Sequence, residues 1–115
     1  MKKPKTGQTW VFHDTVPAEP MPTWKARRVK AHGEDLMVVE NTFSKGDTAP
    51  EHSHPHTQAA YIISGELELT IAGEVHILKK GDTAYIGPNI KHSALAKTDT
   101  LLIDIFTPMR EDFLD

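Results

Sequence analysis

Three histidines stand two residues apart in the segment EHSHPHTQ, and a glutamine follows two residues after the third. These four residues, His52, His54, His56 and Gln58, have the same parity, so an extended segment places them on one face. Neutral imidazole is the commonest protein ligand of first-row transition metals. Pro55 interrupts strand pairing and is expected to turn His56 away. The spacing therefore predicts a metal site built on the other three side chains.

A further histidine is expected from elsewhere in the chain, because four donors usually complete such a site. His92 is the candidate, since it follows a turn rich in glycine, proline and asparagine and begins a strand-like segment. The remaining histidines lack such company and are expected on the surface or on strand faces: His13, His32 and His76. The alternative is that the cluster is a polar loop of solvated histidines without a metal.

A neutral amide in the fourth position has a chemical consequence. Three imidazoles and an amide leave the full 2+ charge on the metal, whereas a glutamate at position 58 would halve it. Such a site attracts an anionic substrate and polarises its oxygens, but it suits oxygen activation less well than a carboxylate-containing iron triad. Gln58 therefore favours Lewis-acid chemistry on a carboxylate or keto acid. The alternative is that Gln58 stands behind the ligands and a water completes the site.

An acid interrupts the apolar run LLIDIF. Asp104 shares the parity of Leu102 and Phe106, and burying its carboxylate is costly unless it is paired or protonated. One interpretation pairs it with Arg110 in a structural salt bridge that ties down the carboxyl-terminal tail. The other makes Asp104 an interior acid/base with a raised pKa and lets the fork of Arg110 bind a substrate carboxylate. The pattern leaves both open.

The composition limits the possible classes of protein. The 115 residues contain no cysteine and have a net charge of −3. One domain, residues 1–115, is expected, and a chain of this length needs no disulfide to hold a core. No signal-length apolar run follows the basic amino terminus, and no segment approaches the ~20 apolar residues that cross a bilayer. We therefore expect a cytoplasmic protein without a membrane partner.

One basic stretch, Trp24–Lys30, stands out on this mildly acidic chain. We expect no nucleic-acid partner, because such a short cluster usually forms a solvated strand or loop face. Arg27, Arg28 and Lys30 better suit a basic rim around a pocket for a small anion.

Alternation of period two predicts an all-β chain. We expect an extended arm over residues 1–23 with a short strand in TWVF. Further strands are expected in DLMVVENTF, AAYIIS, ELELTI, TAYI, HSALA and LLIDIF, with a turn-rich break at SKGDTAPE. A hairpin loop is expected at AGE, after which Val75 and Ile77 resume the buried face, and MREDFLD suits a final turn. Seven to nine short strands favour an antiparallel sandwich or barrel.

Two motifs resemble the signatures of the cupin superfamily. The first, over residues 46–65, has Gly46, His52, His54, Gln58 and Gly65, with glutamine where glutamate is usual. The second, over residues 81–96, has Gly81 and His92, with Pro88 one place late and Asn89 in place of glycine. The resemblance implies a small jelly-roll β-barrel with a metal at its mouth, held by His52, His54, Gln58 and His92. Nickel and zinc are expected first, and iron, manganese or cobalt suits the same donors.

The ending DIFTPMREDFL, within residues 101–115, and the segment HSHPHTQ are similar to the pectin-degradation cupins of the KdgF type. That family opens 4,5-unsaturated uronate monosaccharides, released by pectate and alginate lyases, to linear 4-deoxy-5-keto uronates. The resemblance implies a catalytic aspartate at Asp104, an aromatic neighbour at Phe106 and a substrate-binding arginine at Arg110, and Gln58 matches this family. Small cupins also imply a homodimer. The alternatives are a cupin oxygenase and a non-catalytic sugar-acid binding module; Tyr61 and Tyr85 are expected in the core or at the rim.

Overall fold

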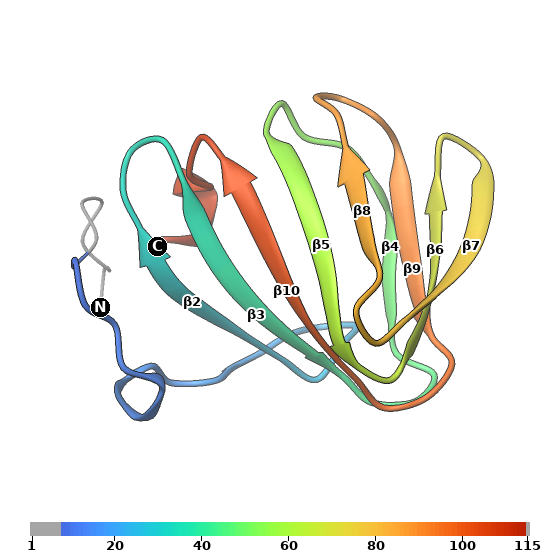
Figure 1. The fold of residues 1–115 in the computed structure, drawn as a ribbon, viewed down its shortest axis with the longest axis horizontal. Helices are drawn as coiled ribbons and strands as arrows, with labels where there is room; N and C mark the ends of the chain where they lie inside the picture. The colour runs from blue at the N-terminus through green and yellow to red at the C-terminus, as the bar shows by residue number, and fades with distance from the viewer. Residues whose placement is uncertain (1–7, 115) are drawn as a thin grey trace.

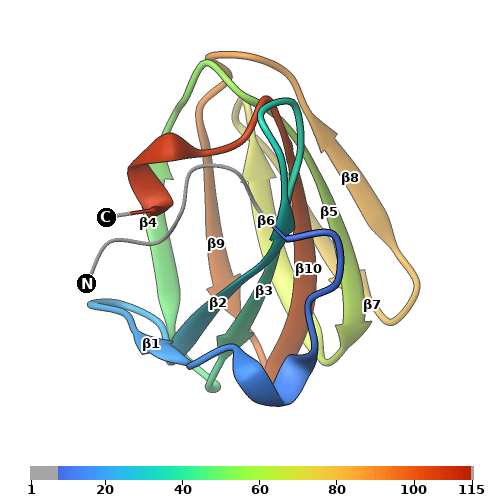
Figure 2. The same cartoon turned by 90° about the vertical axis from the view of Figure 1, so that its left-hand side faces the viewer.

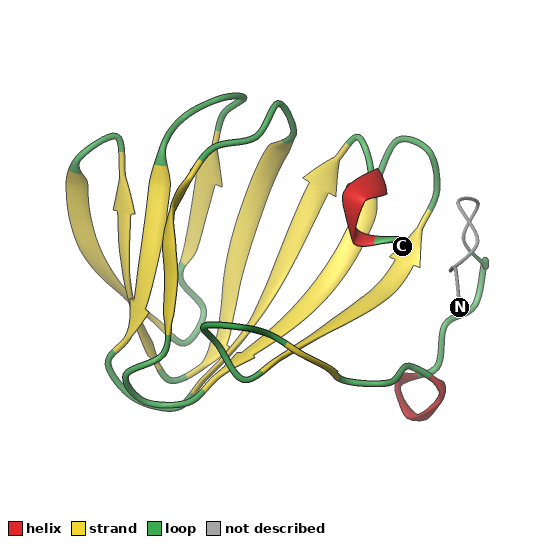
Figure 3. Cartoon of the chain, turned by 180° about the vertical axis from the view of Figure 1, so that it is seen from behind, coloured by secondary structure: helices red, strands yellow, loops and turns green. Residues whose placement is uncertain are grey.

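The computed structural model describes residues 8–114, which form ten strands in two antiparallel sheets that face each other (Figures 1 and 3). The six-stranded sheet has the order β1 (Glu19–Pro20), β2 (Ala26–His32), β3 (Met37–Phe43), β10 (Thr100–Thr107), β5 (Thr57–Ser64) and β8 (Thr83–Ile86). The four-stranded sheet has the order β4 (Thr48–His52), β9 (His92–Ala96), β6 (Glu66–Ile71) and β7 (Glu74–Lys79). Two short 3₁₀ helices, η1 (His13–Thr15) and η2 (Glu111–Phe113), lie near the ends. The expected all-β jelly-roll barrel is confirmed.

Alternation along the strands builds the interior between the sheets. In β10, Leu102, Asp104 and Phe106 are buried, and the residues between them are partly exposed. Two apolar clusters result, one of Phe43, Ala60, Ile62, Leu67, Ala96 and Leu102 and the other of Val29, Met37, Val39, Phe106 and Leu114. Polar side chains are buried in the same interior: Asn41, His54, Gln58, His92 and Asp104. Burying polar groups is costly unless they are hydrogen-bonded. These buried side chains must therefore bond to one another or to a ligand.

Two expectations about the first half of the chain are wrong. TWVF, residues 9–12, forms no strand, and the side chain of Trp10 is 75% exposed. A strand needs a hydrogen-bonding edge beside it, and no described strand pairs with this segment. The turn-rich segment SKGDTAPE contains more structure than expected, since β4 begins at Thr48 and pairs with β9.

The expectation for β7 is also wrong, because Val75 and Ile77 face solvent at 52% and 47% exposure. Ile77 lies opposite Glu68 in the β6–β7 pairing, on the outer face, whereas Leu78 lies opposite Leu67 and packs against the core. The apolar face therefore resumes one residue later than the pattern suggests. A one-residue change of register moves every side chain of a strand to the other face.

The two ends of the described chain are held differently (Figure 2). Beyond η2, Leu114 is 1% exposed and joins the apolar cluster of β2, β3 and β10. The expected arm includes residues 1–7, which lie outside the described residues. Its remainder contains η1 and β1 and runs beside the six-stranded sheet, where the Arg28 side chain donates to the Val16 carbonyl.

Among residues 8–114, no helix is long and apolar enough to cross a membrane.

Gly65 is expected to tolerate no side chain. Its φ is +91°, and a Cβ there would overlap the Asp99 carbonyl oxygen and Thr100. Gly65→Ala should lower the free energy of unfolding by at least about 3 kcal/mol, through backbone strain and overlap together. Gly73→Ala is the matched control, because its φ is +82° but a Cβ meets nothing within 4 Å, so about 1–2 kcal/mol is expected. Urea unfolding measures both; equal losses would contradict the role of the close approach.

Candidate active site

The histidine cluster is assembled from two sheet strands and one loop. His52 ends β4 and lies opposite His92, the first residue of β9. His54 follows in the β4–β5 loop, where its carbonyl oxygen accepts a 2.7 Å hydrogen bond from the Asn89 N–H. Asn89 has φ +62°, a left-handed conformation that asparagine tolerates better than most residues. The β8–β9 turn is therefore tied to the loop that carries the second histidine.

Each of the three rings is oriented by a backbone carbonyl. The Nδ1 atoms of His52, His54 and His92 lie 2.8, 3.0 and 2.8 Å from the carbonyl oxygens of Pro50, His56 and Ile90 respectively. A carbonyl only accepts, so each Nδ1 carries the proton and each Nε2 of the neutral ring keeps its lone pair. Such second contacts are typical of histidines that bind metals.

Among residues 8–114, the Nε2 lone pairs of His54 and His92 meet no hydrogen-bond donor. The three rings each offer a nitrogen within 4.8 Å of the others. His92 Nε2 is buried and has no hydrogen-bond partner in the described part of the chain. His54 Nε2 faces the Oε1 oxygen of Gln58 at 3.0 Å, which brings two acceptors together. A cation between them would satisfy both groups.

Protonation of His54 and His92 would also satisfy their Nε2 atoms, but the environment of both rings disfavours it. Burial lowers the pKa of His92 to about 4, and burial followed by the charge of Arg110 lowers the pKa of His54. Both rings are therefore neutral near pH 7 and their lone pairs are free to bind. Three neutral imidazoles and an amide oxygen fit a divalent transition metal. His56 stays out of this nitrogen cluster and contributes its carbonyl oxygen to His54.

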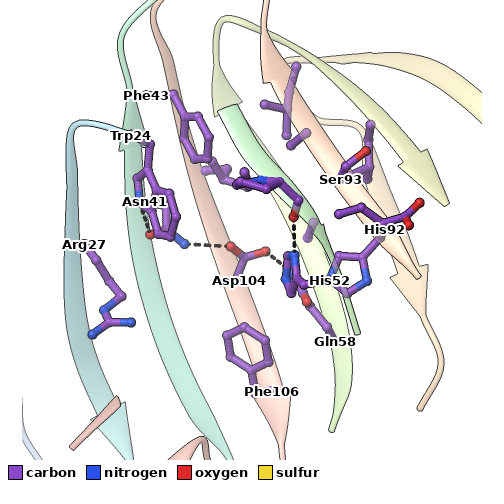
Figure 4. Close-up of a pocket in the computed structure, with 18 of the residues that line it drawn as sticks. Trp24, Arg27, Asn41, Phe43, His52, Gln58, His92, Ser93, Asp104 and Phe106 are labelled. Carbon is purple, nitrogen blue, oxygen red and sulfur yellow. Dashed lines mark hydrogen bonds between the residues drawn. The ribbon is translucent and has the colours of Figure 1, made fainter. Parts of the chain in front are cut away.

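Gln58 connects His54 to Asp104. Figure 4 shows Gln58 beside Asp104. Its Nε2 donates a 2.7 Å hydrogen bond to Asp104 Oδ1, while its Oε1 faces His54. Asn41 Nδ2 donates to the other carboxyl oxygen at 2.8 Å, and Trp24 Nε1 donates to Asn41 Oδ1 at 3.0 Å. Both oxygens of the acid thus accept from amides held by β5 and β3, the neighbours of β10.

Asp104 is an interior acid. Its side chain is 5% exposed, and burial raises its pKa against the opposing effect of the two amide donors. Arg110 does not pair with it. Its Nε and Nη2 donate to the carboxylate of Asp112 at 3.1 and 2.9 Å, so the structural salt bridge considered for Asp104 is wrong. The pair that forms is a local one within the carboxyl-terminal segment.

A cavity of about 390 Å³ opens beside these groups and is large enough for a monosaccharide. Its lining brings together His52, Gln58, His92, Asp104, Phe106 and Arg110. Phe106 lies edge-on to His54 with 5.6 Å between ring centroids, and the Arg110 guanidinium lies 5.0 Å from the Phe106 centroid. The carboxyl-terminal Phe113 also lines the cavity. Six of the seven predicted site residues thus line one space, and the seventh, His54, packs against Phe106.

Some lining residues were not expected. Asn41 shows the same signal as Asp104, a polar residue with the inward parity of β3, and that signal was available in the sequence. Trp24 and Phe113 offered no comparable signal. Arg28 and Lys30 do not line this cavity; both pair with Glu40, at 3.3 and 2.9 Å. The expected basic rim is therefore reduced to Arg27.

The other aromatic and histidine side chains lie away from the cavity. Tyr61 and Tyr85 are 45% and 71% exposed, which places them on the outer surface. The expectation of a core position is therefore wrong for both. The rings of His13 and His76 are 53% and 67% exposed, as expected for surface residues.

Comparisons with known proteins identify the family of this chain. A family model for the cupin domain matches residues 39–106. The chain is 37% identical over 107 residues to the pectin degradation protein KdgF of Dickeya dadantii, covering 91% of this chain and 97% of that protein. The chain belongs to the cupin family. Within that family it is a cupin of the KdgF type.

Two solved structures are similar over nearly the whole chain. An RmlC-like cupin from Shewanella frigidimarina has a TM-score of 0.91 at 30% identity, covering 95% of this chain and 98% of that one. KdgF from Halomonas sp. has a TM-score of 0.87 at 30% identity, with coverages of 93% and 99%.

The metal-free protein is expected to lose stability as the pH falls from about 6.5 to about 4. In that interval the unfolded state binds a proton at His92, whose ordinary pKa is 6.5, and the folded state does not. Stability therefore rises with pH, and the contribution of this ring is on the order of 1–3 kcal/mol. Urea unfolding of chelator-treated protein at several pH values measures it.

His92→Gln should flatten this pH dependence, because the glutamine does not titrate. His76→Gln, at an exposed ring, is the control and should leave the dependence unchanged. An unaltered slope in the His92 variant would show that this ring is not the group responsible.

Proposed function

We propose that this cupin opens 4,5-unsaturated uronate monosaccharides from pectin or alginate to linear 4-deoxy-5-keto uronates, with one divalent transition metal. The KdgF-type family membership supports a role in pectin degradation. The observation that carries the reaction is Asp104, an acid that is 5% exposed and shares one cavity with two of the three clustered histidines, His52 and His92. A non-catalytic binding protein has no need of this costly arrangement.

The ligands of the metal would be His52, His54, His92 and the Oε1 oxygen of Gln58. When bound, the ion supplies Lewis-acid polarisation of a substrate oxygen. Nickel and zinc remain the first candidates, and iron, manganese and cobalt suit the same donors. The chain itself holds the rings in the correct tautomer through the carbonyl oxygens described above.

Asp104 is proposed to move the proton. Opening the ring breaks the bond between C1 and the ring oxygen, releases the proton of the C1 hydroxyl as C1 becomes an aldehyde, and leaves an enolate at C5. Protonation at C4 then gives the ketone, so the proton released and the proton gained balance. Burial favours the protonated form of Asp104, and each of its oxygens keeps a lone pair beyond the amide contacts. It is therefore suited to act as general acid/base.

Arg110 and Phe106 are proposed to hold the substrate. Arg110 would attract the substrate carboxylate, and Phe106 would pack against the sugar and exclude water. The Arg110 guanidinium already lies over the faces of both Phe106 and Phe113, which limits its movement. A fixed cation loses less entropy when an anion binds.

The ultraviolet absorbance of the unsaturated bond tests the reaction. We expect the protein to accelerate the loss of absorbance in freshly lysed pectate or alginate, and Asp104→Asn to reduce that acceleration by about 10²–10⁴-fold because the relay is lost. The metal content should stay near that of the wild type, since Asn keeps the shape of the acid. Asp35→Asn, at an exposed position, is the control.

Three outcomes separate this reaction from its alternatives. Oxygen consumption with bound iron would indicate a cupin oxygenase. Saturable uronate binding with an unchanged decay rate would indicate a binding module. Loss of the metal in the Asp104 variant would make that residue structural.

We also propose the homodimer, through the outer face of the six-stranded sheet. Val38, Ile105, Ala59 and Tyr85 lie side by side across β3, β10, β5 and β8, which makes an apolar row on an exposed face. Tyr85→Glu should convert the dimer to monomer in sedimentation velocity. Val75→Glu, on the outer face of β7, is the matched control. A monomeric wild type would refute the proposal.

A further inference from the structure

Arg27 is an interior arginine that the reaction proposed above does not use. It lies on the inner face of β2, opposite Asn41, the residue that donates to Asp104. Its side chain is 13% exposed and lines the same cavity. Figure 4 shows it at the edge of the cavity opposite His92. Its neighbour Arg28 lies on the outer face and pairs with Glu40, so only Arg27 of the two faces the cavity.

The charge of Arg27 is only partly compensated. Its Nε is buried and has no hydrogen-bond partner in the described part of the chain. The carboxylate of Glu19 is 3.8 Å from Nη2, longer than a charge-assisted hydrogen bond. Burial lowers the pKa of Arg27, and the charge of Arg110 lowers it further, against the attraction of Glu19 and Asp112. Guanidinium nevertheless stays charged at neutral pH, so a buried donor edge is left for an acceptor.

Phe113 holds this edge in position. The guanidinium carbons of Arg27 and Arg110 lie 4.0 and 4.3 Å from the centroid of its ring. A ring under a guanidinium covers the face of the cation and leaves the N–H groups in its plane uncovered. Those in-plane donors are the ones that match a carboxylate.

Arg110 by itself is only partly available for such an anion. Its Nε and Nη2 already donate to Asp112, which closes one edge of its fork. On the same edge of Arg27, the Nη2 forms a 3.8 Å ion pair with Glu19, and the Nε has no hydrogen-bond partner among residues 8–114. The cavity therefore offers two cations around one ring, and the one with the free Nε is Arg27.

We propose that Arg27 binds the substrate carboxylate together with Arg110, and that it makes the cavity selective for uronates over neutral sugars. This inference rests on the proposed function for the identity of the substrate. It is tested without the reaction, since a saturated uronate carries the same carboxylate and cannot be turned over. The failure of one proposal can therefore be distinguished from the failure of the other.

The experiment is calorimetric titration of the protein as purified, at its measured metal content, with galacturonate and with galactose. We expect Arg27→Gln to weaken galacturonate binding by about 10–100-fold, the effect of one charged hydrogen-bond partner, and to leave galactose binding unchanged. Arg28→Gln removes the same charge one residue away on the outer face and should change galacturonate binding less than about twofold. Thermal melts monitor the fold of each variant.

Arg27→Lys provides a second measurement if the glutamine variant folds poorly. It keeps the charge but loses the fork, so galacturonate affinity should lie between those of the wild type and Arg27→Gln. With the unsaturated substrate, Arg27→Gln should raise KM by more than it lowers kcat. The inference is overturned if the wild type binds galacturonate no better than galactose, or if Arg27→Lys and Arg28→Gln retain the same affinity.

Discussion

The two ends of one amide, the side chain of Gln58, determine how the site is organised. Its N–H donates to Asp104, so its oxygen must face His54. A glutamate here would bring two carboxylates within 2.7 Å of each other, and they would have to share a proton. The neutral side chain is therefore required by the acid as much as by the metal. It couples a proton-carrying group to a cation site without adding a charge to either.

Asp104 depends on the sheet for its position. Asn41 lies opposite Leu102 and Gln58 lies opposite Phe106, so the two amides approach the acid diagonally from either side of β10. Trp24 orients Asn41 in turn, through the hydrogen bond to Oδ1. Because these donors come from the two strands that pair with β10, the acid cannot rotate without breaking sheet-anchored contacts. Rigid positioning of this kind is what an acid/base group requires.

The site also has a direction across the cavity. The histidines come from β4, β9 and the loop between β4 and β5, and the arginines from β2 and the carboxyl-terminal segment. Phe113 separates the two arginines and contacts both. An anionic ligand in the cavity thus meets two cationic side chains beside Phe113, Arg27 and Arg110. Salt would weaken this attraction little, because the groups are largely buried.

Local pattern was sufficient for much of this protein. Period-two alternation predicted the all-β class, and the spacing of His52, His54 and Gln58 is a property of one short segment. The inward parity of Asp104 likewise follows from the alternation within its own strand. The same reasoning placed Val75 and Ile77 on the wrong face, because an edge strand has apolar residues on both parities and only its partner decides between them.

The sequence alone determined which residue types were available and which of them share one side of a strand, since both depend on the chain within a few residues. Only the tertiary structure decided which of them meet. Asn41 and Asp104 are 63 residues apart, and Arg110 binds Asp112 rather than Asp104, the partner that one of the two interpretations gave it. The side chain of Arg27 lines the cavity, whereas that of Arg28 lies on the outer face. Such pairings depend on the register between distant strands, and no local pattern encodes that register.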